Sequence, residues 1–170
     1  IRTTKRKEEH GGFYTQHDIY DIIAYASSRQ IEMIPEIDMP GHMMVATKAY
    51  PELLLDSQSA GWGKQFSVPI SPWKESSYTF IENVLSEIIA LFPSHYIHIG
   101  ADEVEKDSWS TSAAAQDFMK EKQIANLHDL QSHFVKRVNN FIRSKNKQSI
   151  GWDEILDGSS DTSMMVMYWR

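Results

Sequence analysis

Two adjacent carboxylates, Asp102 and Glu103, are the residues of this chain whose types and spacing best suit chemistry. They follow a short apolar, β-prone run over residues 96–99 that ends at Gly100. A buried strand that delivers an Asp-Glu pair to an open loop is typical of barrel enzymes, which hold catalytic groups at strand ends. Because side chains alternate along a strand, a bend after Gly100 is needed to bring both carboxylates to one ligand. The pair predicts acid–base chemistry at this loop.

Three further strand-like runs also finish in polar or aromatic residues. The branched run over residues 31–38 enters a sharp turn, and residues 149–152 and 164–169 form the other two runs. The Met-rich start of the last run is most simply a buried strand. The polar and aromatic residues at the ends of these runs are Glu36, Asp38 and His42, then Trp152, Asp153 and Glu154, and lastly Trp169.

Helical patterns alternate with these strands. Thr15 with Asp18 predicts the start of a helix over residues 16–29. Ser76 or Ser77 is expected to cap the next helix, which ends near Leu91. We expect two more helices over residues 112–121 and 126–144, and a long loop without a sustained period over residues 56–77.

The alternation of strands and helices predicts an α/β fold with parallel pairing and right-handed crossovers. About four parallel strands fit either part of a TIM (β/α)8 barrel or a small doubly wound sheet. Several strand ends converge on one site in a barrel, whereas a doubly wound sheet gathers its site mainly at one switch point. We therefore expect residues 1–170 to be a single partial catalytic domain of a barrel. Its open sheet edges require the rest of the barrel or self-association to cover them.

Composition excludes several classes of function. The 170 residues are 41% hydrophobic and 24% charged, which is typical of a globular domain. A net charge of −6 argues against nucleic-acid binding, and the basic cluster over residues 5–7 is answered at once by two glutamates. No apolar run approaches the ~20 residues of a membrane span, and cysteine is absent. The chain starts without Met, so we expect a piece of a longer protein.

Five segments together resemble the family 20 glycoside hydrolases, the β-N-acetylhexosaminidases. They occur in the family's order and cover nearly the whole chain. The segments are Gly12-Phe13-Tyr14-Thr15, Ile34-Pro35-Glu36-Ile37-Asp38-Met39-Pro40-Gly41-His42, Tyr50-Pro51-Glu52-Leu53, His98-Ile99-Gly100-Ala101-Asp102-Glu103-Val104 and Gly151-Trp152-Asp153-Glu154.

The resemblance implies hydrolysis of terminal non-reducing N-acetyl-β-D-hexosamine residues, GlcNAc or GalNAc, from oligosaccharides or glycoconjugates. It implies a retaining, substrate-assisted mechanism through an oxazolinium intermediate, in which no enzyme carboxylate becomes covalently attached. Glu103 matches the family's general acid and base, and Asp102 matches the group that orients the acetamide. No cofactor is implied, and the setting would be secreted, periplasmic or lysosomal.

The resemblance also implies the residues that bind and support the sugar. Trp152 and Trp169 match the aromatic walls around the acetamide methyl group. His42 matches a histidine near the reacting centre, with Asp38 close to it. The supporting residues are Glu36 and His98, and His98 is expected to have a structural role because it lies inside a strand.

Two alternatives remain open. A metal-dependent barrel hydrolase could draw its ligands from scattered strand ends, but close ligand spacing of the H-E-x-x-H type is absent. The second alternative is a sugar-binding or inactive fragment, because the match starts just before the family's third strand and stops at its sixth. The residues that could serve as metal ligands are Asp38, His42, His98, Asp102, Asp153 and Glu154.

Overall fold

A computed structural model of the protein describes residues 12–55, 69–159 and 161–170. The basic cluster over residues 5–7 and most of the predicted long loop, residues 56–68, lie outside the described residues, as does Ser160. The chain forms two compact units, Ile1–Met33 and Ile34–Arg170. The expectation of one domain over residues 1–170 stays a prediction.

The first unit contains helix α1 (Gln16–Ser27), which begins where the sequence predicts and ends two residues earlier. Thr15 caps it: the Thr15 hydroxyl accepts a hydrogen bond from the Asp18 N–H at 3.2 Å, and the Asp18 carboxylate accepts one from the Thr15 N–H at 2.7 Å. This reciprocal pair satisfies two donors that a helix start otherwise leaves open. The predicted helix start is confirmed.

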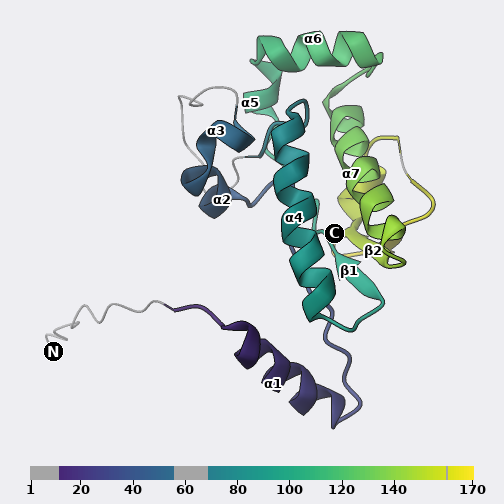
Figure 1. The fold of residues 1–170 in the computed structure, drawn as a ribbon. Helices are drawn as coiled ribbons and strands as arrows, with labels where there is room; N and C mark the ends of the chain where they lie inside the picture. Colours follow the sequence, from purple (N-terminus) through teal and green to yellow (C-terminus); the bar gives the residue numbers. More distant parts are fainter. Residues whose placement is uncertain (1–11, 56–68, 160) are drawn as a thin grey trace, which may run out of the picture. The chain divides into compact units, whose positions relative to one another are not determined.

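The second unit alternates helices and strands along the chain (Figure 1). The short helices were not predicted because they lack a long apolar period, whereas the predicted long helices are confirmed. The elements are α2 (Met44–Ala49), α3 (Pro51–Leu54), α4 (Glu75–Leu91), β1 (Tyr96–His98), α5 (Asp107–Ser110), α6 (Ala113–Lys122), α7 (Leu127–Ser144), β2 (Gln148–Trp152), the 3-10 helix η2 (Asp153–Leu156) and β3 (Met165–Met167).

The three strands form a parallel sheet in the order β1-β2-β3. The predicted strand over residues 31–38 is only partly present, as an isolated parallel bridge between Glu36 and His98. Two main-chain hydrogen bonds of 2.9 Å tie this segment to β1, among them that of the His98 N–H to the Pro35 carbonyl, and a third of 3.0 Å joins Met39 to Ile99 just beyond both. Pro35 has no N–H to donate, which limits regular pairing there.

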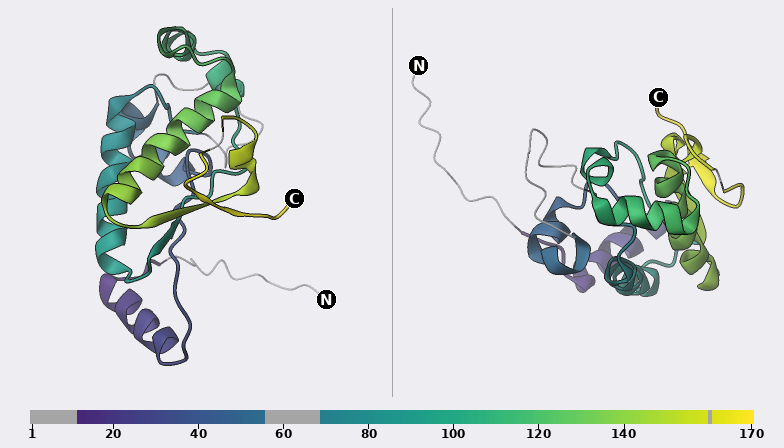
Figure 2. Two further views of the ribbon diagram at one scale, coloured as in Figure 1. Left: turned by 90° about the vertical axis from the view of Figure 1, so that its right-hand side faces the viewer. Right: turned by 90° about the horizontal axis from the view of Figure 1, so that it is seen from above.

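Helices α4 and α7 lie side by side on one face of the sheet (Figure 2). Their buried side chains share one core with the strands, because both helices turn an apolar stripe toward the sheet. This core fixes the strand ends against the helices, which is the requirement for a precise site. Its central members are Ile81 and Leu85 of α4, Phe134, Val138 and Ile142 of α7, and Ile97 and Ile99 of the first strand and its continuation.

Two expectations about these elements are wrong. Neither Ser76 nor Ser77 caps α4, because the helix already begins at Glu75, whose negative charge suits the positive end of the helix dipole. The strand at the chain's end is not buried: Met165, Val166 and Met167 are 42–46% exposed. β3 lies at one edge of the three-stranded sheet, whereas β2 is bordered by strands on both sides. Among the described residues, no helix is long and apolar enough to cross a membrane.

Candidate active site

The chain bends sharply after β1, as the sequence requires for its two adjacent carboxylates. Gly100 and Ala101 have φ angles of +66° and +74°, and Glu103 has +48°. A Cβ atom on Gly100 would lie 1.9 Å from the Asp38 Oδ1 atom, so only glycine fits there. The close approach of Asp38 and the left-handed backbone therefore need the same glycine.

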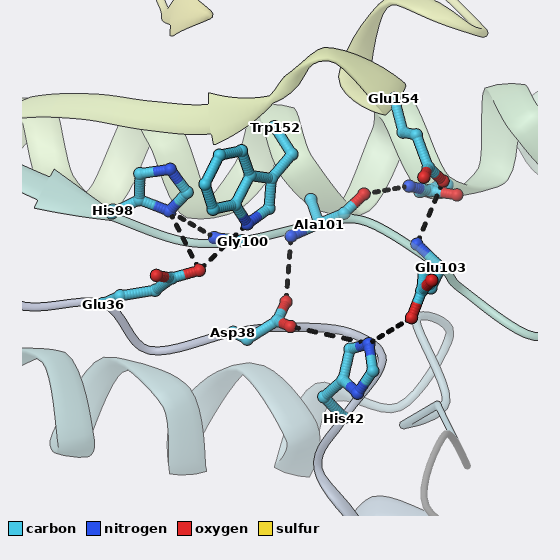
Figure 3. A network of polar contacts seen from close by, with 10 residues as sticks. Glu36, Asp38, His42, His98, Gly100, Ala101, Glu103, Trp152 and Glu154 are labelled. Atoms are coloured by element: carbon cyan, nitrogen blue, oxygen red, sulfur yellow. Dashed lines mark hydrogen bonds and ion pairs between the residues drawn. The ribbon is translucent and has the colours of Figure 1, made fainter. Parts of the chain in front are cut away.

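Side chains from three other segments hold the bent backbone in place (Figure 3). The Asp38 Oδ1 atom accepts a hydrogen bond from the Ala101 N–H at 3.0 Å, and the Gln131 amide of α7 donates to the Ala101 carbonyl at 2.9 Å. The Glu154 carboxylate of η2 accepts a hydrogen bond from the Glu103 N–H at 3.0 Å. The loop that carries the carboxylate pair is thus fixed through its own peptide groups.

His42 lies between two carboxylates (Figure 3). Its Nε2 atom is 3.5 Å from the Glu103 Oε2 atom and 3.8 Å from the Asp38 Oδ2 atom. The Glu103 side chain is 52% exposed, whereas those of His42 and Asp38 are about one quarter exposed. Glu103 therefore faces the solvent side of this cluster and is the carboxylate most open to a ligand.

Asp38 holds its proton more strongly than an ordinary aspartate does. Burial raises the pKa of Asp38 to about 7, and the neighbouring charge of Asp102 acts in the same direction. The Ala101 N–H and His42 oppose the rise without cancelling it. Near neutral pH the Asp38 carboxyl is therefore divided between its protonated and ionised forms.

Asp102 has a free acceptor. Its Oδ1 atom is buried and has no hydrogen-bond partner among the described residues. A buried polar atom without a partner is costly, and such atoms in native proteins usually meet a ligand, water or ion. The arrangement suits an N–H donor that arrives with a bound molecule.

Trp152 is held by two of the predicted supporting residues (Figure 3). Its indole N–H donates to the Glu36 carboxylate at 3.0 Å, and its ring centroid lies 4.7 Å from that of His98. His98 is buried, and its Nδ1 atom accepts a hydrogen bond from the Gly100 N–H at 3.0 Å. Burial also lowers the pKa of His98, so the imidazole is neutral at neutral pH. These contacts agree with a structural role for His98.

Trp169 lies beyond the end of β3 and is 48% exposed. Its backbone N–H donates to the Asp153 carboxylate at 3.2 Å. The next residue, Arg170, donates to Asp153 through Nε at 2.8 Å and to Asp157 through both terminal nitrogens at 3.1 and 3.3 Å. The residues that follow β3 are thus tied to the segment that follows β2.

Three of the six possible metal ligands come together. Asp38, His42 and Asp102 each offer a ligand atom, and these atoms lie within 4.8 Å of one another. The other three have different partners in the structure: Asp153 binds Arg170, Glu154 accepts the Glu103 N–H, and His98 accepts the Gly100 N–H.

Sequence reasoning missed the contacts of Gln131 and Arg170. Gln131 is a buried polar residue next to Leu130 in the apolar stripe of α7, and that placement is a signal that could have been used. Arg170 gives no such signal, because its partners Asp153 and Asp157 belong to another segment.

The fold agrees with the comparisons to known proteins. The family model "Glycosyl hydrolase family 20, catalytic domain" matches residues 1–170. The chain is 41% identical to a beta-hexosaminidase of Porphyromonas gingivalis, over 99% of the chain and 22% of that protein. It is also 41% identical to a beta-hexosaminidase of Vibrio furnissii, over 95% of the chain and 27% of that protein.

Solved structures of this family superpose well on the chain. A GH20 exo beta-N-acetylglucosaminidase of Vibrio harveyi, in complex with N-acetylglucosamine, gives a TM-score of 0.88 at 39% identity, over 98% of this chain and 27% of that one. A beta-N-acetylhexosaminidase of Bacteroides fragilis gives 0.84 at 32% identity, over 96% and 33%.

The chain spans between about a fifth and a third of the length of these relatives. The predicted fold class, part of a TIM (β/α)8 barrel, is confirmed by the three parallel strands with their helices and by the structural neighbours. The extent of the family match and the identity to its members lead to one conclusion: the chain belongs to glycosyl hydrolase family 20.

Proposed function

We propose that the protein containing this chain hydrolyses terminal non-reducing N-acetyl-β-D-hexosamine residues from oligosaccharides or glycoconjugates. Membership of the family and the beta-hexosaminidase relatives support the reaction class. One observation carries the assignment of the site: the buried, unpartnered Asp102 Oδ1 atom stands beside the half-exposed Glu103 on one fixed bend. The proposed reaction of an acetamido sugar needs a hydrogen-bond acceptor for the acetamide N–H and a proton donor for the glycosidic oxygen.

The reaction we propose is substrate-assisted and retaining. Glu103 gives its proton to the glycosidic oxygen as the bond to the anomeric carbon breaks. The acetamide oxygen of the same sugar attacks that carbon and forms an oxazolinium ion. Glu103, now a carboxylate, takes a proton from a water molecule, whose oxygen then attacks the anomeric carbon and reopens the ring with net retention.

The two carboxylates divide the work according to their surroundings. Glu103 is exposed and contacts His42, so it can reach the leaving group and exchange a proton with solvent. The free Oδ1 atom of Asp102 accepts a hydrogen bond from the acetamide N–H. This bond orients the acetamide and stabilises the positive charge that develops on it. His42 lies between Asp38 and Glu103 and stabilises Glu103 as that residue loses and regains its proton.

The aromatic residues supply the recognition of the sugar. Trp152 is fixed by Glu36 and His98, and its flat ring suits the C–H surface of a pyranose and the acetamide methyl group. Trp169 follows the neighbouring strand and forms the second wall. Enclosure of the methyl group by two indole rings selects an N-acetyl sugar over a plain hexose.

The decisive test uses the full-length protein with Glu103→Gln and two aryl N-acetyl-β-glucosaminides, one with a good and one with a poor leaving group. The variant keeps the shape and loses the proton. We expect a loss of roughly 100-fold or more with the poor leaving group and a much smaller loss with the good one. Equal losses with both substrates, or near-normal rates with both, would refute the acid assignment.

A second measurement tests the acetamide as nucleophile. Fluorine atoms on the acetamide methyl group withdraw electron density from the attacking oxygen. We expect turnover by the full-length protein to fall with each added fluorine, and the first-formed product to be the β-anomer. Turnover that does not respond to fluorination would point to a nucleophile supplied by the enzyme.

The grouping of Asp38, His42 and Asp102 keeps metal-dependent hydrolysis as the second candidate. The raised pKa of Asp38 argues against it, because a carboxyl that holds its proton near pH 7 is a weak metal ligand. We expect dialysis against a chelator to leave turnover unchanged. Loss of activity that is restored by a divalent cation would favour the metal-dependent reaction.

A further inference from the structure

The two aromatic walls proposed above come from different strands, and only one of them is fixed within the sheet. Trp152 ends β2 and pairs with Met167 of β3. Trp169 lies two residues beyond that partner and outside the strand. Alternate residues of a strand point to one face, so the register directs both rings toward the same side. Beyond Met167, however, the position of Trp169 has to be fixed by other contacts.

Asp153 supplies these contacts. It directly follows Trp152 in the chain, and one of its carboxylate oxygens accepts the Trp169 N–H at 3.2 Å. The other oxygen accepts the Arg170 Nε–H at 2.8 Å. A single carboxylate next to the first wall therefore holds the backbone N–H of the second wall and the side chain of the residue after it.

We call the contacts of Asp153 and Asp157 with the two residues at 169–170 the clamp, and its buried central carboxylate distinguishes it from a chance surface pair. The Asp153 side chain is only 6% exposed, and burial alone would oppose its charge. Arg170 and the Trp169 N–H outweigh burial and hold the pKa of Asp153 below its usual value. The Asp157 carboxylate accepts hydrogen bonds from both terminal nitrogens of the Arg170 guanidinium. This bidentate geometry restricts rotation of the guanidinium.

From these contacts we infer that Asp153 and Arg170 are positioning residues that set the distance between the Trp152 and Trp169 walls, and thereby the size of the 2-acylamino group that the site accepts. The inference rests on the proposed function, since it takes the two indoles as the walls of the acetamide pocket. Neither Asp153 nor Arg170 needs to touch the sugar. Their effect on selectivity comes through the backbone of Trp169.

The experiment compares Arg170→Met and Asp153→Asn in the full-length protein. Both variants remove the ion pair between Asp153 and Arg170 and change little in volume. Arg137→Met is the matched control, because Arg137 forms an ion pair with Glu75 between α7 and α4 and has no contact with either wall in the described structure. Melting temperatures show that each variant folds, and Arg170, 44% exposed, serves if the buried Asp153 cannot be replaced.

The readout is the ratio of two dissociation constants, for N-acetylglucosamine and for N-butanoylglucosamine, measured by calorimetry. We expect the preference of the wild-type protein for the acetyl sugar to fall roughly tenfold in both clamp variants, because a small displacement of a wall misplaces the group it encloses. The Arg137→Met protein should keep the wild-type preference. An unchanged ratio in a folded clamp variant overturns the inference, even if both sugars bind more weakly.

Failure of the proposed function is distinguishable from failure of this inference. Turnover of an aryl N-acetyl-β-glucosaminide tests the reaction, whereas the ratio of dissociation constants does not depend on turnover. A wild-type protein that binds the acetyl sugar selectively without cleaving it would refute the reaction and leave the clamp standing. A wild-type protein that binds neither sugar, or that binds both equally well, overturns the clamp.

Discussion

The end of β1 and the end of β3 position proposed site residues by different physical means. After β1, peptide groups hydrogen-bond to buried or half-buried side chains, and Gly100 admits Asp38 at a distance that no Cβ atom would allow. After β3, a clamp of charged side chains holds the backbone, and its outer members Arg170 and Asp157 are 44% and 37% exposed. The first arrangement resists change because Gln131 is buried and Gly100 leaves no room for a larger residue beside Asp38.

The second arrangement is adjustable, since exposed charges are hydrated and screened. The carboxylates that we propose for the chemistry lie on a bend held by main-chain hydrogen bonds and by the close approach at Gly100. The proposed second wall depends in addition on the ion pairs of Arg170. Changes at the first end should abolish turnover, and changes at the second should alter selectivity.

The largest effect is expected for Gly100→Ala in the full-length protein. The added Cβ would lie 1.9 Å from Asp38 Oδ1, and the φ of +66° is unfavourable for alanine. Either the Asp38 contact to the Ala101 N–H is lost or the bend moves, and we expect turnover to fall by roughly 100-fold or more. Gly12→Ala is the control, because its Cβ would meet no atom within 4 Å. Full activity of Gly100→Ala would show that the β1 end is as adjustable as the β3 end.

A smaller effect, on stability, is expected for Asp38→Asn. Because burial raises the pKa of Asp38 to about 7, the folded protein keeps a proton that the unfolded chain releases at about pH 4. Folding therefore loses stability as the pH rises from about 4 to 7, and the loss is complete above pH 7. Asparagine cannot ionise, so the free energy of unfolding of the variant should rise relative to the wild-type protein over this pH range.

Thermal unfolding at pH 5 and pH 8 checks this expectation. Asp117→Asn, at an exposed position of α6, is the control and should leave the difference between the two pH values unchanged. An Asp38→Asn protein with the same pH dependence as the wild-type protein would mean that Asp38 is ionised throughout, and that the β1 end relies on charge as the β3 end does.

Sequence reasoning succeeded where the signal is local. The apolar stripe of α7 and the Thr15 cap were readable because their members are three or four residues apart. The bend after β1 was readable because two adjacent carboxylates and Gly100 impose it. The roles of Asp102 and Glu103 came from the family resemblance, and they stay predictions until the variants are measured.

What sequence reasoning missed depends on distant pairs. The Asp38 contact to Ala101 joins residues 63 positions apart, and the bond between Trp152 and Glu36 spans 116 positions. No local period records such contacts. The prediction that β3 is buried was wrong for a related reason. An apolar, Met-rich run has the same sequence pattern in the middle of a sheet and at its edge, and only the strand order distinguishes the two positions.

The smallest effect is expected for Asp157→Asn, which separates the outer half of the β3 clamp from its inner half. The variant weakens the bidentate contact to Arg170 and leaves Asp153 bound to both Arg170 and the Trp169 N–H. Exposed ion pairs contribute about 0.2–1 kcal/mol, so we expect the free energy of unfolding to change by no more than this. The preference for the acetyl sugar should fall, as it does in Arg170→Met, but by only a small fraction of the fall in that variant.

Ionic strength shows whether this remaining effect is electrostatic. Raising the salt concentration to about 1 M shortens the screening length to about 3 Å and should bring the selectivity of the wild-type protein close to that of Asp157→Asn. Glu75→Gln, which removes the partner of Arg137 on the surface between α4 and α7, is the matched control and should leave selectivity unchanged at every salt concentration. If salt left wild-type selectivity unaltered while Asp157→Asn altered it, the outer contact would act through shape, and the contrast between the two strand ends would be one of burial rather than of charge.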